Sequence, residues 1–388
     1  MSKWEMVKLK ELATVVSGST PKTSVSTYWN GEYNWITPAE LSEDTSIINE
    51  TQRKITKLGV DHTGLKSFPK GTVLLSSRAP IGKVAIAGRE MFCNQGFKNL
   101  ICRDELHNKY LFWFLKGKTS FLNSLGRGAT FKEISKAIVE NIIIPLPPLE
   151  VQKKIAQTLG AASELIALRK KQSAELDNLI KSIFYDMFGD PVINEKGWEK
   201  KKVKEVCQVK IGPFGSLLHS NDYIQGGIPL INPSHIIKGK LCADNMLTIT
   251  EEKAQELAQY RMEKDDVVMG RRGEIGRCAV VTDKHDGFLC GTGSLFMKPS
   301  QKLNSVYLMQ TISSTQMRSV LERAAQGITM KNLNSTIVEN IEILLPPLSL
   351  QTHFATIVTK IEEQKSLVQK AIDESQSLFD SLMSQYFE

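Results

Sequence analysis

Two segments of the chain place arginine next to glycine directly after a run of apolar residues. SSRAPIG (76–82) follows TVLL, and GRRGEIG (270–276) follows DVVM, so that Arg78 and Arg272 occupy matching positions. Arginine presents a planar fork that can bind guanine through two hydrogen bonds or clamp a phosphate, and glycine lets a backbone approach a ligand closely. The competing interpretation is a turn closed by an arginine salt bridge.

A second duplicated segment carries amides and a lysine. CNQGFKN (93–99) aligns with CGTGSLF (290–296). Asn94 and Gln95 can read adenine by paired hydrogen bonds, and Lys98 can hold a phosphate. A simple polar loop explains the same residues equally well.

A third pair of segments, GATFKEIS and GITMKNLN, precedes two short helical patterns. Thr130 and Lys132 in the first copy, and Thr329 and Lys331 in the second, can donate hydrogen bonds to phosphates near a helix N-terminus. The alternative is that each threonine only caps its helix.

Sequence patterns that mark common enzymes are missing. There is no GxGxxG for a dinucleotide, no HExxH and no Cys/His cluster for a metal. KGKTS (116–120) lacks the earlier glycine of a phosphate-binding loop because Phe112 stands there, and INPSH (231–235) lacks the second proline and the aromatic residue of an amino-methylation motif. We therefore expect no catalytic residue, no metal and no bound cofactor, although a nuclease carboxylate set is too degenerate to recognise in one sequence.

The composition permits a polyanionic partner, because the 388 residues carry a net charge of +7. The six cysteines include no CxxC pair, which favours free thiols in a reducing cytoplasm. No apolar run is long enough to span a bilayer, and MSKWEMVKLKEL at the start lacks the apolar core of a signal peptide. We therefore expect a cytoplasmic protein.

The elements that must position these segments occur twice. IVENIIIPLPPLEVQKKIA (138–156) returns as IVENIEILLPPLSLQTHFA (337–355), and WEMVKLKELATVVSG from Trp4 returns as WEKKKVKEVCQVKIG from Trp198. The shifts of 199 and 194 positions are too long for a solenoid and indicate a fused pseudo-dimer. The first copy mixes short β-like runs (VLLSSR, VAIAG, IIIPL) with a helical stretch at 109–125, so the fold class is mixed α/β (α+β).

A long helix is predicted after each Pro-Pro pair. The first should begin near Pro148 or Leu149, because proline is tolerated only in the first helical turn. It should end at FGDP (188–191), where glycine caps the helix and proline stops it.

The two long helices carry the same pattern of apolar residues. Spacings of four and three run through 155–187 and again through 354–386, as in a coiled-coil seam. The seams are interrupted by Arg169, Ser173, Lys365 and Ser375. Neither helix should then be stable alone, so we expect the two to pack on each other, and the chain connectivity makes the pair antiparallel.

These features together resemble a known family. GSTPKTSVSTYWNGEYNWITPAEL (18–41) is similar to the opening of its N-terminal target-recognition domain, and GPFGSLLHSNDYIQGGIPLINPSHI (212–236) is similar to the other common opening. With the duplicated Arg/Gly segments and a Pro-Pro-Leu-x-x-Gln start to both helices, essentially the whole chain resembles the DNA-specificity (S) subunit of type I restriction-modification systems.

The resemblance implies a non-catalytic subunit with two globular target-recognition domains in pseudo-twofold symmetry, separated by a long antiparallel two-helix coiled coil. The domains would read the two halves of a bipartite, asymmetric site in double-stranded DNA. The helices would dock two methyltransferase (modification) subunits for adenine methylation, and restriction (translocase and endonuclease) subunits would join them. S-adenosylmethionine, ATP and Mg are expected on those partner subunits. The expected domains are 1–146 and 191–345, with the helices at 147–190 and 346–388.

The resemblance also favours DNA contact for the duplicated loops. The candidate DNA-binding residues are Ser19, Thr20, Lys22, Thr37, Ser76, Arg78, Lys83, Asn94, Gln95, Lys98, Thr130, Lys132, Ser216, Asn232, Ser234, Arg271, Arg272, Arg277, Thr292, Thr329 and Lys331. Trp29 and Trp35 are expected to pack in the core or in a turn, because duplex DNA offers no exposed base face. The alternative function is a single-chain nuclease, or another enzyme with an unrecognised site, fused to DNA-recognition domains.

Overall fold

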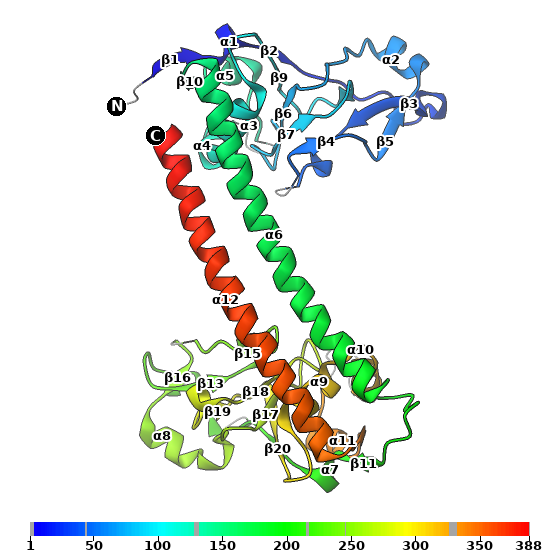
Figure 1. Cartoon of the computed structure of the whole chain (residues 1–388), viewed down its shortest axis with the longest axis vertical. Coiled ribbons are helices and arrows are strands. Elements are labelled where there is room, and N and C mark those ends of the chain that lie inside the picture. Colours follow the sequence, from blue (N-terminus) through cyan, green and yellow to red (C-terminus); the bar gives the residue numbers. More distant parts are fainter. Residues whose placement is uncertain are drawn as a thin grey trace. The chain divides into compact units, whose positions relative to one another are not determined.

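The computed structural model describes residues 4–42, 45–127, 132–214, 217–244, 246–325 and 332–387. Its contacts divide the chain into two compact units (Figure 1). Unit 1 comprises Met1–Lys171 with Gln369–Glu388, and unit 2 comprises Gln172–Val368. Two long helices, α6 (Leu149–Phe188) and α12 (Leu348–Phe387), each contribute one part to unit 1 and the other part to unit 2.

Unit 1 has a mixed α/β fold. Its strands are β1 (Glu5–Lys8), β2 (Ala13–Val16), β3 (Trp29–Ile36), β4 (Ile47–Ile48), β5 (Arg53–Ile55), β6 (Val73–Leu75), β7 (Val84–Ala87), β8 (Phe92–Cys93), β9 (Asn99–Cys102) and β10 (Ile143–Leu146). Its shorter helices are α1 (Leu9–Leu12), α2 (Lys57–Thr63), α3 (Asn108–Gly117), α4 (Thr119–Ser124) and α5 (Lys136–Glu140). The strands form one sheet in the order β2-β9-β6-β7-β4, a second in the order β5-β3-β8, and the pair β1-β10.

Unit 2 is built from the same kinds of element. Its strands are β11 (Lys200–Lys202), β12 (Cys207–Ile211), β13 (Ile228–Ile231), β14 (Ile236–Ile237), β15 (Lys240–Leu241), β16 (Thr248–Ile249), β17 (Val267–Gly270), β18 (Cys278–Val280), β19 (Leu289–Cys290), β20 (Ser294–Pro299) and β21 (Glu342–Leu344). Its shorter helices are α7 (Val203–Val206), α8 (Glu251–Glu256), α9 (Ser305–Ser313), α10 (Thr315–Ala324) and α11 (Ser335–Glu339).

The repeat in the sequence is also a repeat in topology. The order β12-β20-β17-β18 in unit 2 reproduces β2-β9-β6-β7 in unit 1, and β16-β13-β19 reproduces β5-β3-β8. The pairs β1-β10 and β11-β21 also correspond, since each joins the start of a unit to the strand just before its long helix. The prediction of a fused pseudo-dimer with a mixed α/β fold is confirmed.

Each unit packs its sheets against short helices. In unit 1 every residue of α3 from Tyr110 to Leu115 is buried, which explains why that helix is apolar around its whole circumference. The helical stretch predicted for 109–125 is divided in the structure: α3 ends at Gly117, and α4 starts after Lys118, whose backbone leaves the helical region. Glycine is a weak helix former, so the helix breaks there.

The long helices begin and end where the sequence predicts. α6 starts at Leu149 after the Pro-Pro pair and ends at Phe188, and Gly189 follows with a positive φ of 77°. Every predicted seam position is buried or half-buried in both helices. Among the described helices, none combines the length and the apolar composition that a membrane-crossing segment needs.

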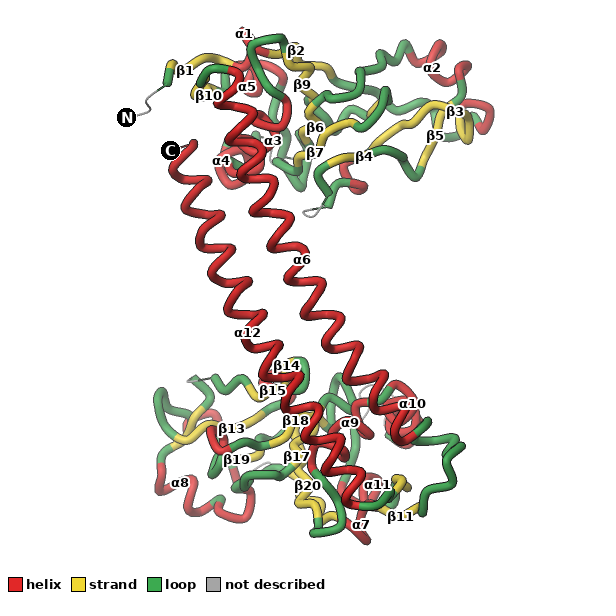
Figure 2. Tube along the Cα trace, viewed as in Figure 1, coloured by secondary structure: helices red, strands yellow, loops and turns green. Residues whose placement is uncertain are grey.

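Contacts within each unit show that the two helices are antiparallel (Figure 2). In unit 1 the start of α6, at Ile155 and Leu159, shares a core with the end of α12, at Met383 and Phe387. In unit 2 the end of α6 shares a core with the start of α12, where Phe184 packs edge-on against Phe354. The predicted direction is therefore confirmed.

Polar residues in the seams also find partners across the helix pair. Arg169 of α6 donates to the Ala371 carbonyl oxygen and to the Ser375 hydroxyl of α12. Lys365 of α12 lies 2.5 Å from Asp177 of α6. These buried or half-buried polar pairs fix which residues of the two helices lie opposite each other.

The glutamine of each Pro-Pro-Leu-x-x-Gln segment ties its helix to the globular part. Gln152 is fully buried, accepts a hydrogen bond from the His107 N–H (2.8 Å) and donates to the carbonyl oxygens of Glu105 and Pro147 (both 2.9 Å). Gln351 makes the same three bonds in unit 2, and is also fully buried; its partners are Asn304, Lys302 and Pro346.

Candidate nucleic-acid interface

Strand directions bring the duplicated polar segments of unit 1 to one edge. β2, β9, β6 and β7 are antiparallel neighbours, so the ends of β2 and β6 lie beside the starts of β7 and β9. β3 and β8 are parallel and end at the same level. We call the loops at this place, 17–22, 76–83 and 94–98 with 132–135, the unit 1 loop edge. The corresponding loops 212–214, 271–277, 291–293 and 332–334 form the unit 2 loop edge, because the strand orders match.

The loops of each edge are joined by the same backbone hydrogen bonds. In unit 1 the Ser77 N–H donates to the Gly96 carbonyl oxygen (2.8 Å), and the Ser77 carbonyl oxygen accepts from Ile134 (2.9 Å). In unit 2 Arg271 takes the place of Ser77, with bonds of 3.1 Å to Gly293 and 3.0 Å from Leu333. Three polar segments that are distant in sequence therefore form one surface in each unit.

Glycine is required where these loops touch. A Cβ atom on Gly18 would lie 1.7 Å from the Cys93 carbonyl oxygen, and one on Gly212 would lie 2.0 Å from the Gly291 carbonyl oxygen. Gly82 and Gly276 close the Arg/Gly turns with φ values of 88° and 79°. Gly18 and Gly212 thus allow two loops to approach closely, and Gly82 and Gly276 allow the turns to adopt a positive φ.

One carboxylate in the unit 1 loop edge holds two cations. Arg78 Nε lies 2.9 Å from Glu133 Oε2, and Lys98 Nζ lies 3.0 Å from Glu133 Oε1. Burial raises the pKa of Glu133, but hydrogen bonds and charges from Lys98 and Arg78 outweigh this and hold it below its ordinary value. The salt-bridged turn that competed with DNA contact is thus present, while 44% of the Arg78 side chain remains exposed.

In unit 2 a different buried cation supports the loop edge. Arg271 is fully buried; its Nε and Nη2 donate to the Thr292 carbonyl oxygen (3.1 and 2.9 Å), and its Nη1 donates to Asn332 Oδ1 (2.8 Å). Its guanidinium also lies 4.9 Å from the centre of the Phe214 ring. Burial, and then the neighbouring Arg272, lower the pKa of Arg271 from its ordinary value. Asn332 corresponds to Glu133, so both buried cations support the same loop position.

Three candidate DNA-binding residues are buried and make contacts within unit 1 or unit 2. Ser76 is fully buried, where its hydroxyl donates to the Pro80 carbonyl oxygen (2.8 Å) and accepts from the Lys83 N–H (2.9 Å). With Lys98 and Arg271, it supports the loops rather than facing solvent. We therefore do not carry these three residues forward as direct DNA contacts.

Other candidates are partly engaged. Lys83 Nζ donates to the Leu41 carbonyl oxygen (2.7 Å). Arg277 pairs with Glu274 and donates to the Pro233 carbonyl oxygen (3.2 Å). These two cations hold neighbouring loops in place.

The remaining candidates divide by their exposure. Those with exposed side chains are Ser19, Thr20, Lys22, Arg78, Gln95, Lys132 and Ser234. Those that are half-buried are Thr37, Asn94, Asn232, Arg272 and Thr292. Thr20 and Gln95 come from different loops and meet through a hydrogen bond of 2.6 Å. Four candidates lie outside the described residues: Thr130, Ser216, Thr329 and Lys331.

The two tryptophans of YWNGEYNWITP pack inside unit 1, as predicted. Trp29 is 9% exposed and Trp35 is 2% exposed, and their rings meet edge to face at 5.1 Å. The exposed side chain of Arg53 lies against the two rings, and Arg53 was not among the residues that the sequence singled out. Trp29 lies opposite Ile55 and Trp35 lies opposite Arg53, although the strand is irregular between them, with a φ of 61° at Asn30. Nothing local in the sequence shows that this strand pairs with the one that carries Arg53.

Metal chemistry finds no support among the described residues. No group of three or more His, Cys, Asp or Glu side chains in that part of the chain is placed to hold an ion. The cysteines are free thiols.

Comparison with known families follows the duplicated architecture. A model of the type I restriction modification DNA specificity domain matches residues 1–178 and again 195–375. The chain is 30% identical over 401 aligned residues to the type I restriction enzyme MjaIX specificity subunit of Methanocaldococcus jannaschii, an alignment that covers 98% of this chain and 91% of that protein.

Solved structures share the fold over the full length. The S subunit of a type I restriction-modification system from M. genitalium superposes with a TM-score of 0.61 at 17% identity, covering 100% of this chain and 96% of that one. A chain from work described as "Structural basis underlying complex assembly and conformational transition of the type I R-M system" gives 0.60 at 19% identity, covering 99% and 97%. The duplicated topology, the matched residues and the relative agree, and the chain belongs to the family of DNA-specificity subunits of type I restriction-modification systems.

Proposed function

We propose that each unit reads one half of a bipartite, asymmetric site in double-stranded DNA. The observation that carries this proposal is the loop edge, which recurs in both units with the same backbone bonds and unlike side chains. Gln95 of unit 1 is replaced by Thr292 in unit 2, and Lys98 by Leu295. A shared frame with different side chains is what two readers of different bases require.

Exposed cations support contact with the DNA backbone. Lys22 and Lys132 are exposed at the unit 1 loop edge, beside the partly exposed Arg78. Lysine and arginine at a polar surface neutralise phosphates and orient a protein on the duplex, while amides and arginine forks read base edges. We assign Lys22 and Lys132 to phosphates, and Arg78, Gln95 and Arg272 to bases.

Two methyltransferase subunits would dock on the long helices. Leu168 of α6 corresponds to Leu367 of α12, and Leu179 to Leu378, and these leucines are exposed by 57%, 65%, 45% and 59% respectively. Unit 1 contains Leu168 and Leu378, and unit 2 contains Leu179 and Leu367, so each unit presents one copy of the same leucine pair. Repeated exposed leucines favour two copies of one partner.

In this proposal the chain itself performs no chemistry. It supplies sequence specificity for adenine methylation by the methyltransferase subunits and for cleavage by restriction subunits, which would carry S-adenosylmethionine, ATP and Mg. The purified chain should neither methylate nor cleave DNA when all three are added. Turnover that persists through further purification and follows the chain would contradict a non-catalytic role.

A domain exchange tests the reading of two half-sites. Residues 196–345 are replaced by the corresponding domain of another family member, and methylated positions in the host genome are mapped by sequencing. One half-site should change and the other should stay as it was. A recognition sequence that is continuous, or an exchange that rewrites both halves, would show that the two units do not read separately.

The docking proposal is tested by counting methyltransferase subunits. Leu168→Gln with Leu378→Gln removes the leucine pair of unit 1, and the mass of the reconstituted complex should fall from two methyltransferase copies per chain to one. Leu165→Gln is the matched control, because Leu165 is 43% exposed on the same helix but its counterpart in α12 is Gln364. Two bound copies in the double variant would rule out this surface.

A further inference from the structure

An exposed arginine rests on the two buried tryptophans of unit 1. The guanidinium carbon of Arg53 lies 3.6 Å from the centre of the Trp29 ring and 5.3 Å from that of Trp35. Stacking on an indole face attracts the cation and limits the orientations of its planar fork. Arg53 is thus held in place by rings that are themselves fixed in the core.

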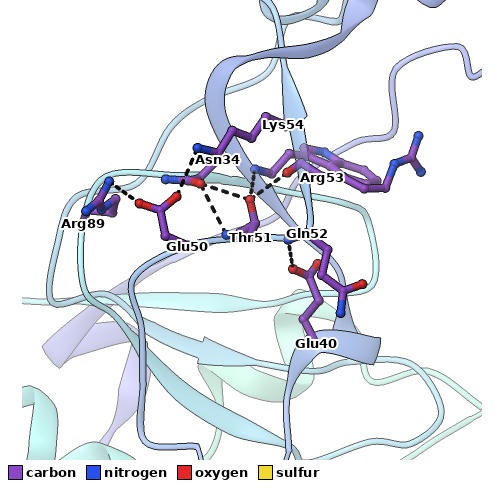
Figure 3. Close-up of polar contacts among 9 residues, drawn as sticks. Asn34, Glu40, Glu50, Thr51, Gln52, Arg53, Lys54 and Arg89 are labelled. Atoms are coloured by element: carbon purple, nitrogen blue, oxygen red, sulfur yellow. Dashed lines mark hydrogen bonds and ion pairs between the residues drawn. The ribbon is translucent and has the colours of Figure 1, made fainter.

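Arg53 differs from the two cations beside it. Glu50 pairs with Lys54 (3.1 Å) and with Arg89 (2.7 Å). Figure 3 shows both cations directed at Glu50, while Arg53 points the other way. Within the described ranges, which exclude residues 43–44, no carboxylate pairs with Arg53. As far as the described residues go, its hydrogen-bonding edge has no carboxylate partner and can meet a ligand.

The backbone that carries Arg53 is also fixed. Thr51, which is buried, donates through its hydroxyl to the Arg53 carbonyl oxygen (2.7 Å) and accepts from the Trp35 N–H (3.1 Å). Asn34 accepts a hydrogen bond from the Thr51 N–H (3.3 Å). This network, seen in Figure 3, locks β5 against β3 at Arg53.

The same tryptophans connect Arg53 to the unit 1 loop edge. The indole N–H of Trp35 donates to the Ser19 carbonyl oxygen (3.1 Å), and that of Trp29 donates to the Lys22 carbonyl oxygen (3.3 Å). Arg53 itself pairs with Trp35, at the end of β3 nearest the loops. It therefore extends the proposed DNA surface of unit 1 rather than forming a separate site.

The described part of unit 2 has no equivalent of this arrangement. Tyr223 stands in place of Trp29 and Leu247 in place of Arg53. Leu230 stands in place of Trp35, because Ile231 pairs with Cys290 as Ile36 pairs with Cys93. Leu247 lies opposite Leu230, whose N–H donates to the Leu247 carbonyl oxygen (3.1 Å), as Arg53 lies opposite Trp35. Leu247 carries no charge, so a role for Arg53 applies to one half-site alone.

We propose that Arg53, mounted on Trp29 and Trp35, is a specificity-determining residue that reads a guanine in the half-site bound by unit 1. This inference rests on the proposed function of DNA reading. The fork of arginine matches the O6 and N7 acceptors of guanine in the major groove. A fork already oriented by stacking loses less conformational freedom on binding than a free side chain.

The test uses the full-length chain reconstituted with the methyltransferase subunits of its source organism. Selection from randomised duplexes gives the base preference, and binding at several salt concentrations gives the affinity and its salt dependence. Arg53→Ala should abolish a guanine preference at one position of one half-site and lower affinity for the selected duplex about 10-fold or more. Arg53→Lys, which keeps the charge without the fork, should lose the same preference while retaining the salt slope.

Two controls separate base reading from general loss of charge. Arg89→Ala removes a cation that is paired with Glu50, and should leave every base preference unchanged. Replacing the read guanine by 7-deazaguanine removes the N7 acceptor, and should weaken binding of the unaltered chain but not of Arg53→Ala. Thermal melting of each variant confirms that it folds.

The inference is overturned if Arg53→Ala keeps all base preferences. It is equally overturned if that variant loses affinity for every sequence alike, with the salt slope reduced by about one, because that is the behaviour of a phosphate contact. Failure of the proposed function looks different, since the unaltered chain would then select no sequence at all.

Discussion

Lys98 Nζ lies 3.0 Å from Glu133 Oε1, and only 10% of the Lys98 side chain is exposed. A nearly buried ammonium group needs a charged partner, so Glu133 supports the unit 1 loop edge from within. The corresponding support in unit 2 is Arg271 with Asn332. The two units thus keep one frame with different buried cations, and this difference can be tested.

Glu133→Gln should destabilise unit 1 by about 1–3 kcal/mol, because the amide leaves Lys98 without a counter-charge. The measurement is the free energy of unfolding in urea. Asp61→Asn is the matched control, since Asp61 pairs with Lys57 at 3.3 Å in a pair whose side chains are 57% and 73% exposed, and it should cost less than about 1 kcal/mol. Equal losses in the two variants would mean that Lys98 does not depend on Glu133.

Protonation of two carboxylates should lower the stability of the protein in acid. Burial raises the pKa of both Glu133 and Glu362. Lys98 and Arg78 outweigh this effect at Glu133 and hold its pKa below the ordinary 4.5. Lys365 and Lys240 do the same at Glu362. A carboxyl whose pKa is lowered by folding stabilises the protein above its unfolded pKa, and loses that contribution as the pH falls through its folded pKa.

The unfolding free energy should therefore decline as the pH drops below about 4.5. Urea titrations from about pH 3 to about pH 8 measure it, and Glu133→Gln and Glu362→Gln should each show a shallower decline than the unaltered chain. Parallel pH profiles in all three proteins would contradict the assignment of the acid sensitivity to these carboxylates.

Gln152→Leu and Gln351→Leu should each lower stability by about 2–4 kcal/mol, because each leaves a half-buried N–H and two carbonyl oxygens without their partners. The two effects should be similar, since the bonds are equivalent in the two units. Gln157→Leu changes an exposed glutamine of the same helix and should have little effect. Urea unfolding measures all three, and a neutral Gln152→Leu would show that these bonds do not hold the helix.

Arg78→Ala should weaken binding to the recognised DNA by about 1–3 kcal/mol and relax base preference in one half-site only. Arg272→Ala should do the same for the other half-site, because the two residues hold matching positions in the two units. Fluorescence anisotropy with duplexes altered in either half measures this. Unchanged affinity and salt slope in both variants would leave these arginines with a structural role in their turns.

Lengthening both helices should lengthen the unread spacer between the half-sites. Seven residues are inserted after Ser173 in α6 and seven after Val368 in α12, positions that face each other because Asp177 pairs with Lys365 and Arg169 bonds to Ser375. A heptad keeps the seam and adds about 10 Å, which corresponds to about three base pairs. Sequencing of methylated sites should show a longer spacer with unchanged half-sites.

The same insertion in α6 alone should abolish binding, because the two helices then no longer match in length. A spacer of unchanged length in the doubly extended chain would contradict the prediction that the length of the helices sets the spacing of the half-sites.

The sequence alone determined the features that are local or periodic. The Pro-Pro pair and Gly189 set the ends of α6, and the spacing of four and three set the seam, because helix capping and amphipathic packing depend on neighbours along the chain. The duplication fixed the shared topology of the two units. The break between α3 and α4 at Lys118 was not predicted, although Gly117 was visible there.

Only the tertiary structure decided the partners of the polar loop residues. Lys98 meets Glu133 across 35 positions, and Arg53 meets Trp29 across a strand pairing, so neither contact leaves a periodic signal. Sequence reasoning placed Lys98 and Arg271 among direct DNA contacts, because a loop cation looks the same whether it faces solvent or a buried partner. Whether a loop cation faces solvent or a buried partner depends on which loops meet beside it. The packing of the sheets brings those loops together, and the residues next to each cation in the sequence do not.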